Sequence, residues 1–194
     1  PEKSISSLYT VNPFTNNLIH LGNKGFNLLN LISDKKPVPA AFVITTEVFR
    51  CRDVVFGFSR AREEFMQRVR NSLNEIEQRT GKVYGSPDKP LLLSVRSGGA
   101  ISMPGMMATI HNVGFNEELI EEHIREHGNA YLCWDNYRRF VQSWAMISGM
   151  KREDFQELMD SAKARHKVKL KRQFSPEQMK ELALAYQKLV RQRG

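Results

Sequence analysis

The amino-acid pattern of this 194-residue chain changes near Gly114, and this change constrains the fold more than any other feature. Before Gly114, short apolar or β-branched runs such as Phe42–Thr45 and Leu91–Val95 alternate with helical periodicities. After it, apolar residues recur at helical spacings of three and four. We therefore predict a mixed α/β (α+β) part over residues 1–114 and an all-helical part over residues 115–194.

Residues 1–114 contain signals for both strands and helices. A helix is predicted where Leu28, Leu29 and Ile32 recur at helical spacing. A long amphipathic helix is predicted from an N-cap at Ser59. The run Leu91–Val95 is largely apolar and bounded by Pro90 and by glycines, which predicts a buried strand. Further strands are predicted around Leu8–Val11, at Phe42–Thr45 and over Ala108–Val113.

Residues 115–194 show the signals of capped helices. Asn116 is a predicted N-cap, and Gly128 suits the position just after a helix C-terminus. Ser175–Gln178 combines an N-cap serine, a proline in the first turn and a glutamine that completes a capping box. One helix carries an apolar stripe that we expect to be buried: Trp134, Tyr137, Val141 and Trp144.

The formal net charge of +8 comes from one segment. Residues 161–194 contain ten lysines and arginines against two glutamates, whereas residues 1–160 contain 19 basic and 19 acidic residues. Nucleic-acid binding is one interpretation of such an excess. The segment has few aromatic residues among its charges, so we favour a solvated helix face with a basic linker and expect no nucleic-acid partner.

Several classes of protein are disfavoured. No apolar run approaches the roughly 18 residues of a membrane helix. The start of the sequence lacks a basic-then-apolar signal region, which predicts a cytoplasmic protein without a membrane partner. Cys51 and Cys133 match no zinc or redox spacing, and we expect them to be reduced core residues. The chain does not begin with Met, and we expect it to be a piece of a larger protein.

The most informative chemistry follows the strand at Leu91–Val95. That strand leads directly into Arg96, whose guanidinium cannot stay unpaired in an apolar core and is expected at the strand's end. Ser97–Gly99 and Ser102–Gly105 follow, and a loop of this kind can offer backbone N–H groups to phosphates. An arginine fork beside it suits phosphate oxygens. The alternative is an ordinary turn whose arginine pairs with a carboxylate.

Two other cations are weaker candidates. Lys24 lies in Gly22–Gly25 just before a predicted helix, where backbone donors and the helix dipole favour an anion. The spacing is not that of a Walker A loop. Arg139 could meet a phosphate, but Asp135 four residues earlier suits a helix-surface ion pair with it. His123 and His127 lie four residues apart without the HExxH pattern, and we expect a surface pair.

These motifs resemble those of pyruvate, phosphate dikinases. Ser94–Gly98 followed by Ser102–Met107 is similar to part of the nucleotide-binding domain of that family. Leu21–Leu28 resembles the family's Leu-Gly-Gly-Lys-Gly-x-Asn-Leu stretch. Val38–Phe42 and Tyr137–Phe140 also match, so the resemblance runs over nearly the whole chain.

The resemblance implies an ATP-grasp fold, with residues 1–114 as its first lobe and residues 115–194 as a helical insert or linker. The implied activity is that of a phosphotransferase, which converts ATP, pyruvate and phosphate into AMP, phosphoenolpyruvate and diphosphate through a phosphohistidine. The implied cofactors are ATP and Mg²⁺, the Mg²⁺ ligands being expected outside these residues. The phosphohistidine domain and the pyruvate-binding domain would belong to the parent chain.

By position, the resemblance implies that Lys24 and Arg96 contact ATP phosphates and that Arg139 lies near the same site. The implied loop over the phosphates consists of Ser102, Met103, Pro104, Gly105 and Met106. The chain departs from the family pattern at Asn23, Ala100 and Ala108. A diverged, non-catalytic lobe that serves as a nucleotide-binding or regulatory module is therefore the alternative function, and a basic nucleic-acid-binding protein is a third.

Overall fold

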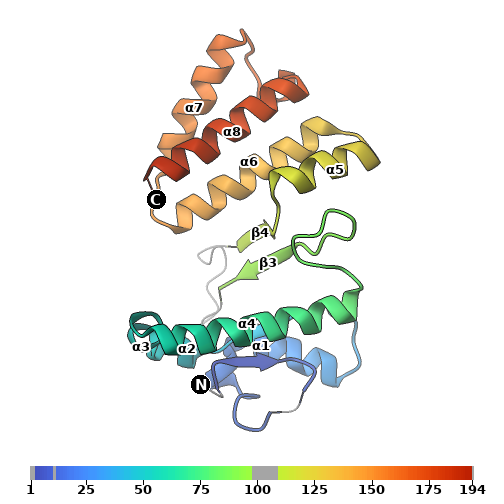
Figure 1. Cartoon of the computed structure of the whole chain (residues 1–194), viewed down its shortest axis with the longest axis vertical. Coiled ribbons are helices and arrows are strands. Elements are labelled where there is room, and N and C mark those ends of the chain that lie inside the picture. Colours follow the sequence, from blue (N-terminus) through green and yellow to red (C-terminus); the bar gives the residue numbers. More distant parts are fainter. Residues whose placement is uncertain (1–2, 11, 98–108, 194) are drawn as a thin grey trace. The chain divides into compact units, whose positions relative to one another are not determined.

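The computed structural model describes residues 3–10, 12–97 and 109–193 (Figure 1). These residues form α-helices and two small antiparallel sheets, so the chain belongs to the mixed α+β class. The described residues form two compact units. The N-terminal unit extends to Lys82 and includes Ser97, and the C-terminal unit contains Val83–Arg96 and the residues from Thr109 onward. The chain thus passes from the first unit to the second after Lys82 and returns to the first at Ser97, while the division into domains 1–114 and 115–194 stays a prediction.

The N-terminal unit pairs one short sheet with helices. Its elements are β1 (Ile5–Ser7), α1 (Leu18–Ser33), β2 (Phe42–Ile44), α2 (Thr46–Arg50), α3 (Arg52–Gly57) and α4 (Ser59–Thr80). β1 and β2 are antiparallel, with Ile5 opposite Ile44. The strand at Phe42 is confirmed. The prediction of a strand around Leu8–Val11 is wrong, because the paired strand β1 ends at Ser7. Leu8 follows that strand, and its side chain is buried in the core.

Helix α4 confirms the long amphipathic helix but not its cap. The residue before the helix is Phe58, which makes no side-chain cap hydrogen bond, and Ser59 is already helical. Phe65 and Ile76 are the buried residues of the helix. The helix ends at Gly81, whose φ of 67° is left-handed and suits glycine.

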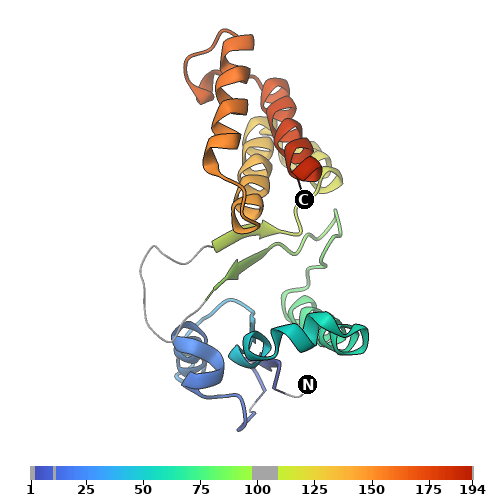
Figure 2. The ribbon, with the colours of Figure 1, turned by 90° about the vertical axis from the view of Figure 1, so that its left-hand side faces the viewer.

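The C-terminal unit consists of a β-hairpin and helices. Its elements are β3 (Leu93–Arg96), β4 (Thr109–Val113), α5 (Glu117–His127), α6 (Ala130–Ile147), α7 (Arg152–Arg165), a 3₁₀ turn (Lys171–Gln173) and α8 (Pro176–Arg193). Helix α6 packs against α5, α7, α8 and β4 (Figures 1 and 2). The core between these helices contains Phe155, Met179 and Tyr186, all almost fully buried. The Tyr186 hydroxyl donates to the Phe155 carbonyl at 2.8 Å.

The predicted caps of these helices are confirmed. The Asn116 side chain accepts from the Leu119 N–H at 2.8 Å at the start of α5, and Gly128 follows the helix. At α8, the Ser175 hydroxyl accepts from the Gln178 N–H at 3.2 Å, and the Gln178 side chain accepts from the Ser175 N–H at 2.9 Å. Each cap satisfies backbone donors that lack partners within the helix.

Three expectations about burial are wrong. Val95 is 49% exposed, because β3 lies in a two-stranded hairpin rather than inside a covered sheet. Trp144 is 50% exposed, although Trp134 on the same helix is 3% exposed, because the core covers only part of the predicted stripe. Cys51 is exposed, whereas Cys133 is buried as expected. Among the described residues, no helix is long and apolar enough to cross a membrane.

Candidate functional site

Arg96 is the last residue of β3, where it lies opposite Thr109 at the start of β4. Its side chain is exposed. Within the described part of its own unit, no carboxylate lies at ion-pair distance from its guanidinium. A cation with this exposure and no bound carboxylate keeps its fork of donors available for an external anion.

The hairpin around Arg96 has a polar face. Ser94 and Arg96 are two residues apart on β3, so both side chains lie on the same face, and Thr109 and His111 stand beside them on β4. Ser94, Arg96 and His111 are exposed. The Ser94 hydroxyl lies 3.1 Å from His111 Nδ1. This pair was not singled out from the sequence, although the alternation of the two strands could have placed both residues on the face of Arg96.

Lys24 lies on α1, just after a break in the helix. Gly22 has φ 65° and ψ 172°, so the helix is interrupted there and resumes at Asn23. Glycine is required in this conformation, because a side chain at positive φ and extended ψ is strained. Lys24 is exposed, and its ammonium group donates to the Ser97 carbonyl at 3.1 Å. Lys24 therefore lies within α1, near the start of the segment after the break, whereas the sequence predicted it just before a helix.

Arg139 lies on α6 and is held by a buried carboxylate. Its guanidinium is 2.9 Å from Asp135 Oδ2, which confirms the predicted ion pair, and its side chain is 62% exposed. Asp135 also contacts Arg138 at 2.7 Å and Lys171 at 2.5 Å, and its own side chain is 3% exposed. The pairing leaves most of the Arg139 side chain accessible.

The titration of Asp135 reflects these contacts. Burial acts to raise the pKa of Asp135, but hydrogen bonds from Lys171 and Arg138, together with their positive charges, outweigh it and lower the pKa below its ordinary value. Asp135 is therefore ionised at neutral pH. The partnership with Lys171, 36 residues away in the chain, has no local sequence signal.

The remaining predicted site residues lie outside the described residues. They are Ser102, Met103, Pro104, Gly105 and Met106, together with Ala100 and Ala108 among the departures from the family pattern. Of the residues that are described, Lys24 belongs to the N-terminal unit, and Arg96 and Arg139 belong to the C-terminal unit.

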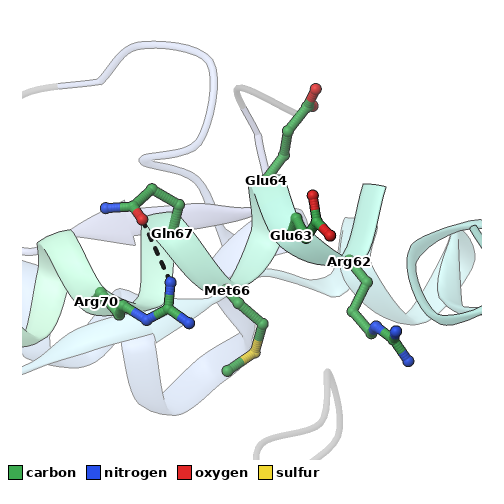
Figure 3. Close-up of a pocket in the computed structure, with 6 residues that line it drawn as sticks. All are labelled: Arg62, Glu63, Glu64, Met66, Gln67 and Arg70. Atoms are coloured by element: carbon green, nitrogen blue, oxygen red, sulfur yellow. Dashed lines mark hydrogen bonds between the residues drawn. The ribbon is translucent and has the colours of Figure 1, made fainter. Parts of the chain in front are cut away.

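A shallow hollow on α4 does not coincide with these residues (Figure 3). One helix supplies its whole lining: Arg62, Glu63, Glu64, Met66, Gln67 and Arg70. Arg70 donates to the Gln67 side chain at 3.3 Å, while Glu64 and Met66 project to opposite sides in the view. Binding pockets are usually enclosed by several elements, so we assign no ligand to this hollow.

The described residues contain few neighbouring groups of the kinds that bind metals. No group of three or more His, Cys, Asp or Glu side chains that could hold a metal ion occurs in residues 3–10, 12–97 and 109–193. The rings of His123 and His127 meet edge to face on α5 with centroids 4.6 Å apart, as expected of a surface pair.

Comparison with known proteins gives the family. No family model matches the chain. The chain is 37% identical over 167 residues to the pyruvate, phosphate dikinase of Entamoeba histolytica, a match that covers 86% of this chain and 19% of that protein. It is 38% identical over 146 residues to the enzyme of that name from Rhizobium meliloti, covering 75% and 16%. The chloroplastic form of Mesembryanthemum crystallinum is 34% identical over 167 residues, covering 86% and 17%.

The chain thus spans under a fifth of the length of these relatives. Identities of 33% or more recur among relatives from bacteria, protists and plants. Over the segment that it spans, the chain belongs to the pyruvate, phosphate dikinase family.

Proposed function

We propose that this chain is the ATP-binding part of a pyruvate, phosphate dikinase-like phosphotransferase. In this proposal it forms the first lobe of an ATP-grasp domain, with the helices after residue 114 as an insert. The parent enzyme would convert ATP, pyruvate and phosphate into AMP, phosphoenolpyruvate and diphosphate. The phosphohistidine domain and the pyruvate-binding domain would lie in parts of the protein outside this chain.

The observation that carries the proposal is the exposure of the Arg96 guanidinium and its lack of a carboxylate partner in the described part of its unit. Arg96 is exposed at the end of β3 within the stretch that resembles the family motif, and no carboxylate in the described part of its own unit pairs with it. The alternative, an ordinary turn whose arginine pairs with a carboxylate, therefore has no support in the described part of that unit. A guanidinium fork is well matched to phosphate oxygens.

The other residues have complementary roles in this proposal. Lys24 would supply a point charge near the start of a helical segment, where backbone donors also favour an anion. Arg139 would use the part of its guanidinium that Asp135 does not engage. Ser102–Met106 would close over the phosphates.

The donor set fits the phosphates of ATP but not its metal ion. Arginine and lysine bind anions, whereas Mg²⁺ requires oxygen ligands. The described residues offer no carboxylate cluster for it. In this proposal, as the family resemblance implies, the Mg²⁺ ligands lie in other parts of the parent protein.

Titration calorimetry with ATP tests the assignment. An arginine–phosphate hydrogen bond contributes about 1.5–3 kcal/mol, so Arg96→Ala is expected to weaken ATP binding by roughly ten- to a hundredfold. Lys24→Ala should have a similar or smaller effect, because lysine acts as a single point charge. Arg60→Ala is a matched control, since Arg60 is an exposed arginine on α4 paired with Glu64. If Arg96→Ala binds ATP as tightly as the wild type does, the assignment is wrong.

The alternative is a non-catalytic module that binds a nucleotide or regulates a partner. It rests on the departures from the family pattern at Asn23, Ala100 and Ala108. The complete reading frame separates the two. The enzyme requires downstream metal-binding carboxylates and a histidine-bearing domain, whereas a module does not. The cellular location stays a prediction, because relatives of this chain include chloroplastic proteins.

A further inference from the structure

We propose that Ser94 and His111 form a second phosphate-contacting group beside Arg96, with the His111 ring as the donor to a phosphate oxygen. This inference rests on the proposed function, because it adds a contact to the same anion-binding hairpin. The ligand class is a phosphate group, either within a nucleotide polyphosphate or as the free ion.

The first support is a β-bulge that sets the direction of His111. β3 and β4 pair Leu93 with Val113 and Val95 with Ile110, so Ser94 alone lies opposite two residues of β4, His111 and Asn112. Asn112 adopts a left-handed conformation with φ 60°. A bulge of this kind redirects side chains, and bulges are over-represented beside active sites. Here the result is a His111 ring against the Ser94 hydroxyl.

The second support is the position of the pair relative to Arg96. The extra residue of the bulge is on β4, so β3 keeps its alternation and presents Ser94 and Arg96 on one face. Residues two apart on a strand are roughly 7 Å apart at Cα, which is within the span of two long polar side chains that bind neighbouring phosphates. On the opposite face, Ile110 is 6% exposed where β4 packs on α6, whereas its partner Val95 is 49% exposed.

The third support is the chemistry of the pair. The Ser94 hydroxyl lies at hydrogen-bond distance from His111 Nδ1, and when it donates to that nitrogen the ring proton is on Nε2. Nε2–H is then a donor, as an anionic ligand requires. Both residues are exposed, and an exposed hydrogen bond contributes little to stability. The bulge, with Asn112 in the left-handed conformation, therefore gains little stability from this pair alone.

The test is ATP titration of the 194-residue protein with a matched set of variants. His111→Leu is expected to weaken ATP binding by about three- to tenfold, as for the loss of one hydrogen bond. His111→Gln should restore part of the affinity, because its amide can still donate. The ATP affinity of Ser94→Ala should lie between that of the wild type and that of His111→Leu. His127→Leu is the control, since His127 is an exposed histidine on α5 and should change the affinity by less than about 1.5-fold.

Ligand comparison identifies the source of the phosphate. Tripolyphosphate and inorganic phosphate are titrated beside ATP. If His111→Leu loses affinity for ATP and tripolyphosphate but not for inorganic phosphate, the pair contacts a polyphosphate chain. If it also loses affinity for inorganic phosphate, the pair contacts a single phosphate group. NMR spectra of the ring nitrogens give a second readout in the unmutated protein, where ATP should shift the His111 signals and leave those of His127 in place.

The outcomes separate this inference from the proposed function. If Arg96→Ala loses ATP affinity while His111→Leu and Ser94→Ala retain it, and the His111 ring signals do not move, this inference is wrong and the proposed function stands. If Arg96→Ala has no effect, the proposed function is wrong, and this inference is wrong with it.

Discussion

At the scale of single residues, Asp135 determines the arrangement of three cations. Its Oδ1 accepts a hydrogen bond from the Arg138 guanidinium, and its Oδ2 contacts Arg139 and Lys171. Arg138 is itself 7% exposed and lies over the Tyr186 ring at 5.4 Å. A buried guanidinium needs such a counter-charge. The spacing of four residues predicted the ion pair between Asp135 and Arg139. The burial of the Asp135 carboxylate and its contact with Lys171 could not be predicted, because both depend on how α6 packs against the 3₁₀ turn.

Replacing Asp135 should therefore destabilise the C-terminal unit. Asp135→Asn leaves the buried Arg138 without its counter-charge, and breaking a buried pair of this kind typically costs about 3–5 kcal/mol. The pKa of Asp135 is lowered from its ordinary value of 3.8, so the stabilisation is present above that value and is lost as the pH falls through the folded-state pKa. Urea unfolding should show a large difference between variant and wild type at pH 7 that narrows below about pH 4. Asp160→Asn is the control, with an exposed carboxylate and little expected change. Equal stability at pH 7 would contradict the assignment.

At the scale of elements, two local cap signals predicted their helices correctly and the one at Ser59 did not, whereas burial, which depends on a packing partner, was predicted less well. The caps at Asn116 and Ser175 act within four residues, so the sequence alone could predict them. The burial of Val95 and Trp144 depends on which elements cover β3 and α6, and the sequence pattern carries no such information. The same holds for the site. Arg96 at a strand end was predictable, whereas the Ser94–His111 pair required the register of a bulged hairpin.

The break in α1 gives a prediction at this scale. Gly22→Ala places a side chain at φ 65° and ψ 172°, a conformation that costs on the order of 1–3 kcal/mol for a residue other than glycine. The helix could relieve the strain by continuing through Gly22, which would move Lys24 away from the Ser97 carbonyl. Thermal unfolding should show a lower midpoint, and ATP affinity should fall with it. Gly57→Ala is the control, because a Cβ there meets nothing within 4 Å and the backbone does not have positive φ. A Gly22→Ala protein as stable as the control would contradict the role given to the break.

At the scale of the whole molecule, the basic C-terminal segment is part of the fold. Lys171 contacts Asp135, Lys180 contacts Glu121 and Arg193 contacts Asp154, so several of its charges bind carboxylates of other elements. The buried face of α8 packs against α6, which adds an apolar reason for the segment to be ordered. The predicted helix face is thus present on α8, several of its cations being paired with carboxylates, while the absence of a nucleic-acid partner stays a prediction.

ATP binding and ATP turnover place different demands on this chain. Phosphoryl transfer depends on positioning and on metal ions that neutralise charge between the β- and γ-phosphates. The chain spans 19% of the Entamoeba histolytica relative, and its described residues supply cations for phosphates but no carboxylate cluster for a metal. We therefore expect the 194-residue protein to bind ATP and to release neither AMP nor phosphate from it above the rate of a protein-free blank. Coupled assays for AMP and phosphate, run with Mg²⁺ and excess pyruvate, measure this directly. ATP turnover that persists after purification and disappears in Arg96→Ala would place the metal ligands inside this chain. It would contradict the proposal that they lie in other parts of the parent protein.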